Sequence, residues 1–371
     1  MYPVVAAGEI LSGPRLPQAQ EEYPSAMAID TDEQDALRPE SGSAKPLAVA
    51  SRRVMAPIHK VGWRTIRYVL GAIFLAYLVR RIVVQGVPTD REYLAKLVVT
   101  GLAITVLGRG WRQLLWVLID WLPFTAVLVL YDRSRTFADT AGMPLHLTDI
   151  AHAEKAVFFG HVPTVWLQEH FYSPGHVHWY DAVASLVYSS HFLVTPIVAA
   201  VLWLSARTVF YRYISRVVLL SFAGLATYVL FPEAPPWMAS QHGAIGPVTR
   251  ISALGWTWMH AGFAKHALEA GQNGGSNPVA AMPSLHFAFS ALAALYVASR
   301  LRSRWRWLVW LYPAAMALTL VYTGEHYVLD EIAGALYALA AHVVIGRAER
   351  WWAARRGAQP VTADLGNAER M

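Results

Sequence analysis

Long runs of apolar residues, separated by shorter polar segments, dominate the chain after residue 55. An α-helix needs about 20 consecutive apolar residues to cross the hydrocarbon core of a bilayer, and each run reaches or approaches that length. The pattern therefore predicts an all-α protein, a polytopic transmembrane helical bundle with about eight spans. The runs cover residues 66–84, 93–107, 114–131, 182–204, 217–231, 284–298, 307–322 and 329–345.

Arginine residues alternate with these apolar runs in a way that predicts their orientation. Basic clusters follow every second run, whereas the other connecting segments are poor in basic residues. Cytoplasmic loops carry the excess of Lys and Arg in membrane proteins. We therefore expect an integral protein of the cell membrane, with the N- and C-termini in the cytoplasm. The clusters lie at residues 109–112, 207–216, 300–306 and 347–356.

The same pattern divides the chain into four parts. Residues 1–55 are rich in Pro, Ala and acidic residues and contain no long apolar run, which predicts a disordered cytoplasmic tail. Residues 56–110 contain the first two spans, and residues 111–350 contain the remaining six. Residues 351–371 form a cytoplasmic C-terminal tail in this division.

Two segments on the predicted outer side are long. Residues 132–181 contain six histidines and several aromatic residues, for which we expect one or two helices lying in the membrane interface. A metal site is an alternative explanation for these histidines, but interfacial histidines are commoner. Residues 232–282 are rich in proline at one end and in glycine near the other, which predicts non-helical edges.

Composition narrows the possible functions. Only 15% of the residues are charged and 55% are hydrophobic, whereas soluble domains carry about 25% charged residues. The chain has no cysteine, which excludes disulfides, thiolate metal sites and cysteine nucleophiles. The net charge of +6 comes from arginines that flank apolar runs, so we expect a membrane and no nucleic acid as partner.

Two histidines and an aspartate lie at the outer ends of predicted spans. His286 opens the sixth span, and His326 and Asp330 lie between the seventh and the eighth. If the eighth helix begins by Glu325, His326 and Asp330 share one helical face. A carboxylate that contacts one imidazole nitrogen makes the other nitrogen a better nucleophile, and a second histidine can protonate a leaving oxygen. Displacement at phosphorus through a phosphohistidine requires these groups.

The spacing of His286, His326 and Asp330 also allows two other interpretations. His326 and Asp330 can brace the start of a helix, and His286 can cap its own helix or lie in the interface. Two histidines and an aspartate can also hold a zinc ion with one open position. Ionisable groups at membrane depth are costly, however, which favours a functional role.

The motifs around these residues resemble the second and third signatures of the type 2 phosphatidic acid phosphatase (PAP2) superfamily. The stretch from Ala281 to His286 reads Ala-Met-Pro-Ser-Leu-His, and Glu325 to Asp330 reads Glu-His-Tyr-x-x-Asp. With the segment from Phe231 to Trp237, these variants are most similar to the inositol phosphorylceramide synthase-like branch of that superfamily. The resemblance covers residues 110–345.

This resemblance implies a fold, a mechanism and an absence of cofactors. It implies a six-helix core, so that residues 111–350 form the catalytic domain and the first two spans are additions. By the family pattern His326 is the nucleophile, Asp330 its orienting partner and His286 the general acid. The family works without a metal ion or an organic cofactor.

Two phosphate-binding features of the family are missing. The chain lacks a Lys-x6-Arg-Pro signature, and Thr319 and Leu320 occupy the positions of the Ser-Arg pair that precedes the nucleophile. Because phosphoryl transfer depends on positioning and charge stabilisation, other residues must bind the phosphate. The candidates at the outer face are Tyr131, Arg133, Arg135, Lys155, His191 and Ser284.

The resulting hypothesis is a lipid phosphotransferase that works at the extracytoplasmic face. It moves a phosphoryl or phospho-alcohol group, such as phosphoinositol, from a phospholipid or polyprenyl-type donor to an alcohol. That alcohol is a polar acceptor such as inositol, or a glycan or lipid hydroxyl. With water as acceptor the same groups give a lipid phosphate phosphatase. A non-enzymatic membrane transporter or scaffold is the third hypothesis.

Overall fold

The chain folds into helices joined by loops in the computed structural model, which describes residues 62–85, 91–274 and 277–356. These ranges contain no β-strand, although isolated β-bridges occur at the edges of loops. The helices are α2 (Trp63–Gln85), α3 (Arg91–Val106), α4 (Trp111–Ala141), α5 (Asp149–Val157), α6 (Pro163–Phe171), α7 (Trp179–Ser205), α8 (Arg207–Leu230), α9 (Pro236–Gln241), α10 (Gly255–Trp258), α11 (Gly262–Gly274), α12 (Leu285–Ala298), the 3-10 helix η2 (Arg304–Trp310), α13 (Leu311–Tyr322) and α14 (Val328–Arg355).

Three of the described helices, α7, α8 and α14, are long and apolar enough to cross a membrane. The prediction of an all-α membrane protein is therefore confirmed, whereas the eight spans and the six-helix core stay predictions. Helix length accounts for part of the difference, since α12 has 14 residues and α13 has 12. A perpendicular crossing needs about 20 helical residues, so neither helix meets that length by itself.

Several predicted boundaries shift in the structure. Helix α4 continues to Ala141, ten residues beyond the end of the third apolar run at residue 131, and α14 continues to Arg355, beyond the predicted domain boundary at residue 350. Residues 132–181 also contain the short helices α5 and α6. The predicted tail 1–55 lies outside the described residues, as does the part of the C-terminal tail after residue 356.

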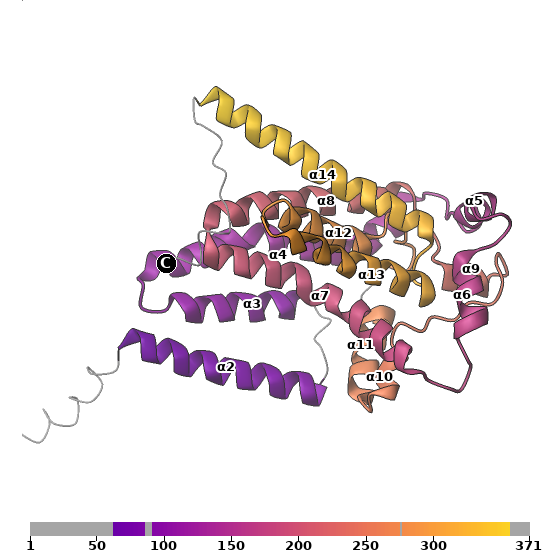
Figure 1. Cartoon of the computed structure of the whole chain (residues 1–371), viewed down its shortest axis with the longest axis horizontal. Coiled ribbons are helices and arrows are strands. Elements are labelled where there is room, and N and C mark those ends of the chain that lie inside the picture. The colour runs from indigo at the N-terminus through magenta and orange to yellow at the C-terminus, as the bar shows by residue number, and fades with distance from the viewer. Residues whose placement is uncertain (1–61, 86–90, 275–276, 357–371) are drawn as a thin grey trace, which may run out of the picture. The chain divides into compact units, whose positions relative to one another are not determined.

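Helix α12 lies in the middle of the helices that carry the predicted site. It contacts α7, α8, α13 and α14, as Figure 1 shows. Small residues on α12, among them Ala288 and Ala291, are buried and let its neighbours approach closely. Leu292 and Tyr296 on the same helix pack into the main apolar core against residues of α8. The start of α12 is therefore held firmly by packing.

The outer faces of the long helices carry exposed apolar side chains. On α7, Ile197, Val201 and Leu204 recur at spacings of three and four residues, and each is more than half exposed. This spacing places them on one face of the helix. A stripe of this kind is costly in water but suits contact with lipid, because a bilayer solvates apolar side chains.

Gly334 sets the distance between α12 and α14. A Cβ atom at this position would lie 2.6 Å from the carbonyl oxygen of Ser284, a backbone atom that cannot rotate away. We expect Gly334→Ala to destabilise the protein by about 1–3 kcal/mol and to lower turnover, because it pushes the two helices apart. Thermal unfolding and an activity assay check this prediction. Gly71→Ala, in α2 with nothing within 4 Å of the added Cβ, is the matched control and should lower neither quantity.

Candidate active site

His326 and Asp330 meet through a helix cap. Helix α14 begins at Val328, not by Glu325 as the shared-face prediction required, so that His326 lies in the turn before the helix. Asp330 folds back over the helix start, and its Oδ2 accepts a hydrogen bond from the Tyr327 amide at 2.8 Å. The same oxygen lies 3.5 Å from His326 Nδ1, within ion-pair distance. Both side chains are buried, so the two groups interact away from water.

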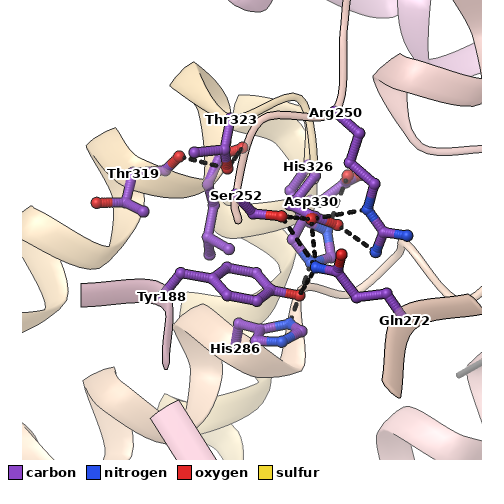
Figure 2. Close-up of polar contacts among 11 residues, drawn as sticks. Tyr188, Arg250, Ser252, Gln272, His286, Thr319, Thr323, His326 and Asp330 are labelled. Carbon is purple, nitrogen blue, oxygen red and sulfur yellow. Dashed lines mark hydrogen bonds and ion pairs between the residues drawn. The ribbon is translucent and has the colours of Figure 1, made fainter. Parts of the chain in front are cut away.

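His286 approaches His326 from the other side. It is the second residue of α12, and its Nδ1 lies 3.4 Å from His326 Nε2. A backbone bond joins the two motifs, because the Ser284 amide donates to the Asp330 carbonyl at 3.0 Å. His326 thus turns Nδ1 toward a carboxylate and Nε2 toward a second imidazole, as Figure 2 shows. This arrangement leaves the two ring nitrogens of His326 with different neighbours.

The other predicted site residues have different outcomes. His191, on α7, lies beside His286 with ring centroids 4.3 Å apart. Ser284 is fully buried, and its Oγ accepts a hydrogen bond from the Phe287 amide, so we assign its hydroxyl to the cap of α12. Lys155 lies in the last turn of α5, where a cation interacts favourably with the helix C-terminus. Tyr131, Arg133 and Arg135 belong to α4, but their side chains lie outside the described residues.

Arg250 is a cation near the two histidines. It was not among the residues predicted from the sequence. It forms a two-pronged ion pair with Glu325, the residue before His326: Nε donates to Oε1 at 2.9 Å and Nη2 donates to Oε2 at 2.8 Å. Its guanidinium also lies over the Trp237 ring, 5.1 Å from the centroid. Burial alone would lower the pKa of Arg250, but the charge and hydrogen bonds of Glu325 outweigh burial and raise it.

Long-range hydrogen bonds hold the Arg250 segment against the turn that carries His326. The side chain of Gln168, on α6, donates to the carbonyls of Thr249 at 2.8 Å and of Tyr322 at 2.9 Å. The Ile251 amide donates to the Thr323 carbonyl at 3.2 Å. Three segments that are far apart in the sequence therefore meet beside His326, and no local sequence motif predicts this contact.

Tyr188 and Gln272 complete this side of the site. The Tyr188 ring, on α7, stacks on His286 with centroids 5.2 Å apart. Gln272, on α11, donates from Nε2 toward Tyr188 OH at 3.2 Å, toward Ser252 Oγ at 2.9 Å and toward Glu325 Oε1 at 3.1 Å. Figure 2 draws these side chains around His286 and His326. The site therefore combines two imidazoles, a guanidinium and several neutral hydrogen-bonding groups.

Buried acids lie behind the His326–Asp330 pair. Glu154, on α5, caps α14, because its Oε1 accepts from the amides of Val328 at 2.6 Å and Leu329 at 3.3 Å. Burial, opposed by these hydrogen bonds and assisted by the charge of Asp330, raises the pKa of Glu154 to about 7. Glu233 is fully buried, and burial followed by the charge of Asp330 raises its pKa well above the ordinary value.

The Glu154 pKa predicts how stability depends on pH. Because the folded protein holds this proton more tightly than the unfolded chain, the contribution is fully present below pH 4.5 and is lost as the pH rises through about 7. Glu154→Gln should remove a loss of about 3 kcal/mol that the wild type suffers between pH 5 and pH 8. Thermal unfolding at both pH values measures the difference. Glu269→Gln, an exposed acid on α11, should behave as the wild type does.

A family model of the PAP2 superfamily matches residues 148–344, more than half of the chain. The chain belongs to the PAP2 superfamily. The match includes all three predicted catalytic residues, together with Arg250 and Glu325.

A curated relative supports the inositol phosphorylceramide synthase-like branch of the PAP2 superfamily. The chain is 26% identical over 227 residues to the phosphoinositol dihydroceramide synthase of Bacteroides thetaiotaomicron. The aligned region covers 59% of this chain and 73% of that relative. No solved structure gave a significant match. Membership in this family supports an enzyme of lipid metabolism, a phosphotransferase or phosphatase that acts on a lipid within the membrane.

Proposed function

We propose that this PAP2 protein is a lipid phosphotransferase that moves a phospho-alcohol group from a lipid donor to an alcohol. The observation that carries the proposal is the position of His326, with Nε2 3.4 Å from His286 Nδ1 and Nδ1 3.5 Å from Asp330. The name of the Bacteroides relative favours phosphoinositol as the transferred group and a ceramide-type lipid hydroxyl as an acceptor. Inositol itself and glycan hydroxyls are further acceptors in this proposal.

The reaction takes place in two displacements at phosphorus. In the first, the lone pair of His326 Nε2 forms a bond to phosphorus and the bond from phosphorus to the lipid oxygen breaks. His286 gives its proton to that leaving oxygen, while Asp330 stabilises the imidazolium that forms on His326. In the second, the acceptor hydroxyl attacks phosphorus, its proton passes to His286, and the bond to His326 breaks. Both histidines then return to their starting states.

The membrane orientation completes the proposal. The basic clusters predict cytoplasmic termini, which places the starts of α12 and α14 at the extracytoplasmic face. The proposed reaction uses neither a metal ion nor an organic cofactor, because His326 supplies the nucleophile and His286 the proton. A chelator should therefore leave the turnover of the purified protein unchanged.

The test separates a transferase from a phosphatase. Purified protein in phospholipid vesicles receives phosphatidylinositol labelled with ³²P, alone, with inositol, or with a ceramide-type lipid alcohol. A new labelled lipid that appears only with the ceramide-type alcohol, or a labelled water-soluble diester that appears only with inositol, supports the transferase. Labelled water-soluble phosphate ester, formed at the same rate with and without alcohol, would instead support the second candidate, a phosphatase with water as acceptor. No turnover of phosphatidylinositol, phosphatidic acid or a polyprenyl phosphate would contradict both.

A further inference from the structure

Glu325 receives an unusual number of hydrogen bonds for a residue next to the proposed nucleophile. Its Oε1 accepts from Arg250 Nε at 2.9 Å, from Ser252 Oγ at 2.5 Å and from Gln272 Nε2 at 3.1 Å. The second oxygen accepts from Arg250 Nη2 at 2.8 Å. A carboxylate that accepts from the guanidinium on both oxygens, and from two further donors on one of them, fixes the orientation of the guanidinium. Arg250 is therefore positioned before any substrate arrives.

A second ion pair in the same chain shows what a structural pair looks like. Arg216 and Glu349 join α8 to α14 through bonds of 2.8 and 3.1 Å, and there the arginine side chain is 5% exposed and the glutamate 29%. In the Arg250–Glu325 pair the arginine is the more exposed member, because its side chain is 24% exposed and that of Glu325 is 6% exposed. The accessible member of the pair is thus the cation. This arrangement suits binding of an anion.

We propose that Arg250 binds the non-bridging oxygens of the donor phosphate and that Glu325 makes this subsite selective for phosphodiesters over phosphomonoesters. The inference rests on the proposed function, since it names the charge class of the substrate for the same site. Arg250 takes the role of the two family arginines that this chain lacks, one in the absent Lys-x6-Arg-Pro signature and one at the position of Leu320. Trp237, whose ring lies under the guanidinium, keeps Arg250 in place.

The charges around His326 favour a phosphodiester over a phosphomonoester. Arg250 carries one positive charge, and Glu325 and Asp330 carry negative charges close to His326. A phosphodiester carries one negative charge, which the guanidinium matches. A phosphomonoester carries about two near neutral pH, and its second charge adds to the repulsion from the two carboxylates. Glu325 therefore raises the cost of binding a dianion more than that of binding a monoanion.

The test compares two donors in variants of the pair. Steady-state kcat/KM is measured with phosphatidylinositol, a diester, and with phosphatidic acid, a monoester. Glu325→Gln should shift the ratio of the two values at least about tenfold toward the monoester, because one repelling charge is removed. Arg250→Gln should lower kcat/KM for both donors by at least about 100-fold, and Arg250→Lys should recover only part of it, since Lys lacks the planar fork.

Arg216→Lys and Glu349→Gln are the matched controls, because they alter a comparable ion pair elsewhere in the chain. They should leave the donor ratio unchanged. An unchanged ratio in folded Glu325→Gln, or wild-type kcat/KM in Arg250→Gln, would overturn the assignment and leave the proposed transferase intact. If the wild type turns over neither donor, the proposed function fails instead. Protection against thermal unfolding by dimethyl phosphate, a monoanionic phosphodiester, then tests Arg250: loss of protection in Arg250→Gln supports the anion site, and equal protection overturns it.

Discussion

Replacing His326 with Gln is expected to abolish turnover, lowering kcat by at least about 10⁴-fold, because the first step has no nucleophile without it. Gln keeps a polar side chain of similar length, so the turn between α13 and α14 should remain folded. His326 is 4% exposed and its Nε2 faces His286, so no other described imidazole nitrogen occupies the same position. The loss should be equal for every donor, including donors with activated leaving groups.

The control for this substitution is His266→Gln on α11. The His266 side chain is 82% exposed and pairs with Glu269, outside the proposed site. It should keep wild-type turnover and wild-type thermal stability. If His326→Gln were folded and retained more than about one tenth of wild-type turnover, a phosphohistidine at this residue would no longer be tenable, whatever acceptor the enzyme uses.

Replacing His286 with Ala should give the second largest effect, a loss of about 10²–10⁴-fold in kcat with a natural lipid donor. A lipid alkoxide leaves poorly without a proton, and His286 is the group 3.4 Å from the attacking nitrogen. A 4-nitrophenyl phosphodiester has a leaving group that needs no proton. With this donor the first step should be nearly as fast in His286→Ala as in the wild type, and only the second step should be slow.

Burst kinetics detect that difference. His286→Ala should release about one equivalent of nitrophenol per active site in a fast phase, followed by slow release, because the covalent intermediate accumulates. His326→Gln should give no burst with the same donor. An equal loss in His286→Ala for both kinds of donor would assign His286 to positioning rather than to proton transfer. His191, 4.3 Å from His286 between ring centroids, would then be the next candidate for the proton donor.

The sequence predicted that His286, His326 and Asp330 lie together, but it did not predict their local geometry. His286, His326 and Asp330 could be recognised because each lies at the end of an apolar run, in a short motif with a characteristic spacing. The condition for a shared helical face is not met, since α14 begins at Val328 and Asp330 caps it through the Tyr327 amide, which leaves His326 outside the helix. Side-chain caps of this kind depend on which backbone groups need a partner, and residue spacing alone does not reveal them.

Arg250 could not be predicted from the sequence for a different reason. It lies 75 residues before Glu325, and the contact depends on Gln168 of α6 and on backbone bonds to the turn after α13. No periodicity in residues 242–254 marks the segment as part of a site. The buried acids were missed likewise, because Glu154 reaches the start of α14 only when α5 folds against it. Long-range packing therefore supplied the charge that the family signatures lack.

The most direct test of the account is identification of the covalent intermediate. His286→Ala protein is mixed with a 4-nitrophenyl phosphodiester of inositol, quenched in alkali within the burst phase, digested and examined by mass spectrometry. The peptide with His326 should carry the added mass of phosphoinositol, in a linkage that is stable to alkali and labile to acid, and His326→Gln should carry none. A burst without a modified histidine, or with the label on another residue, would contradict it.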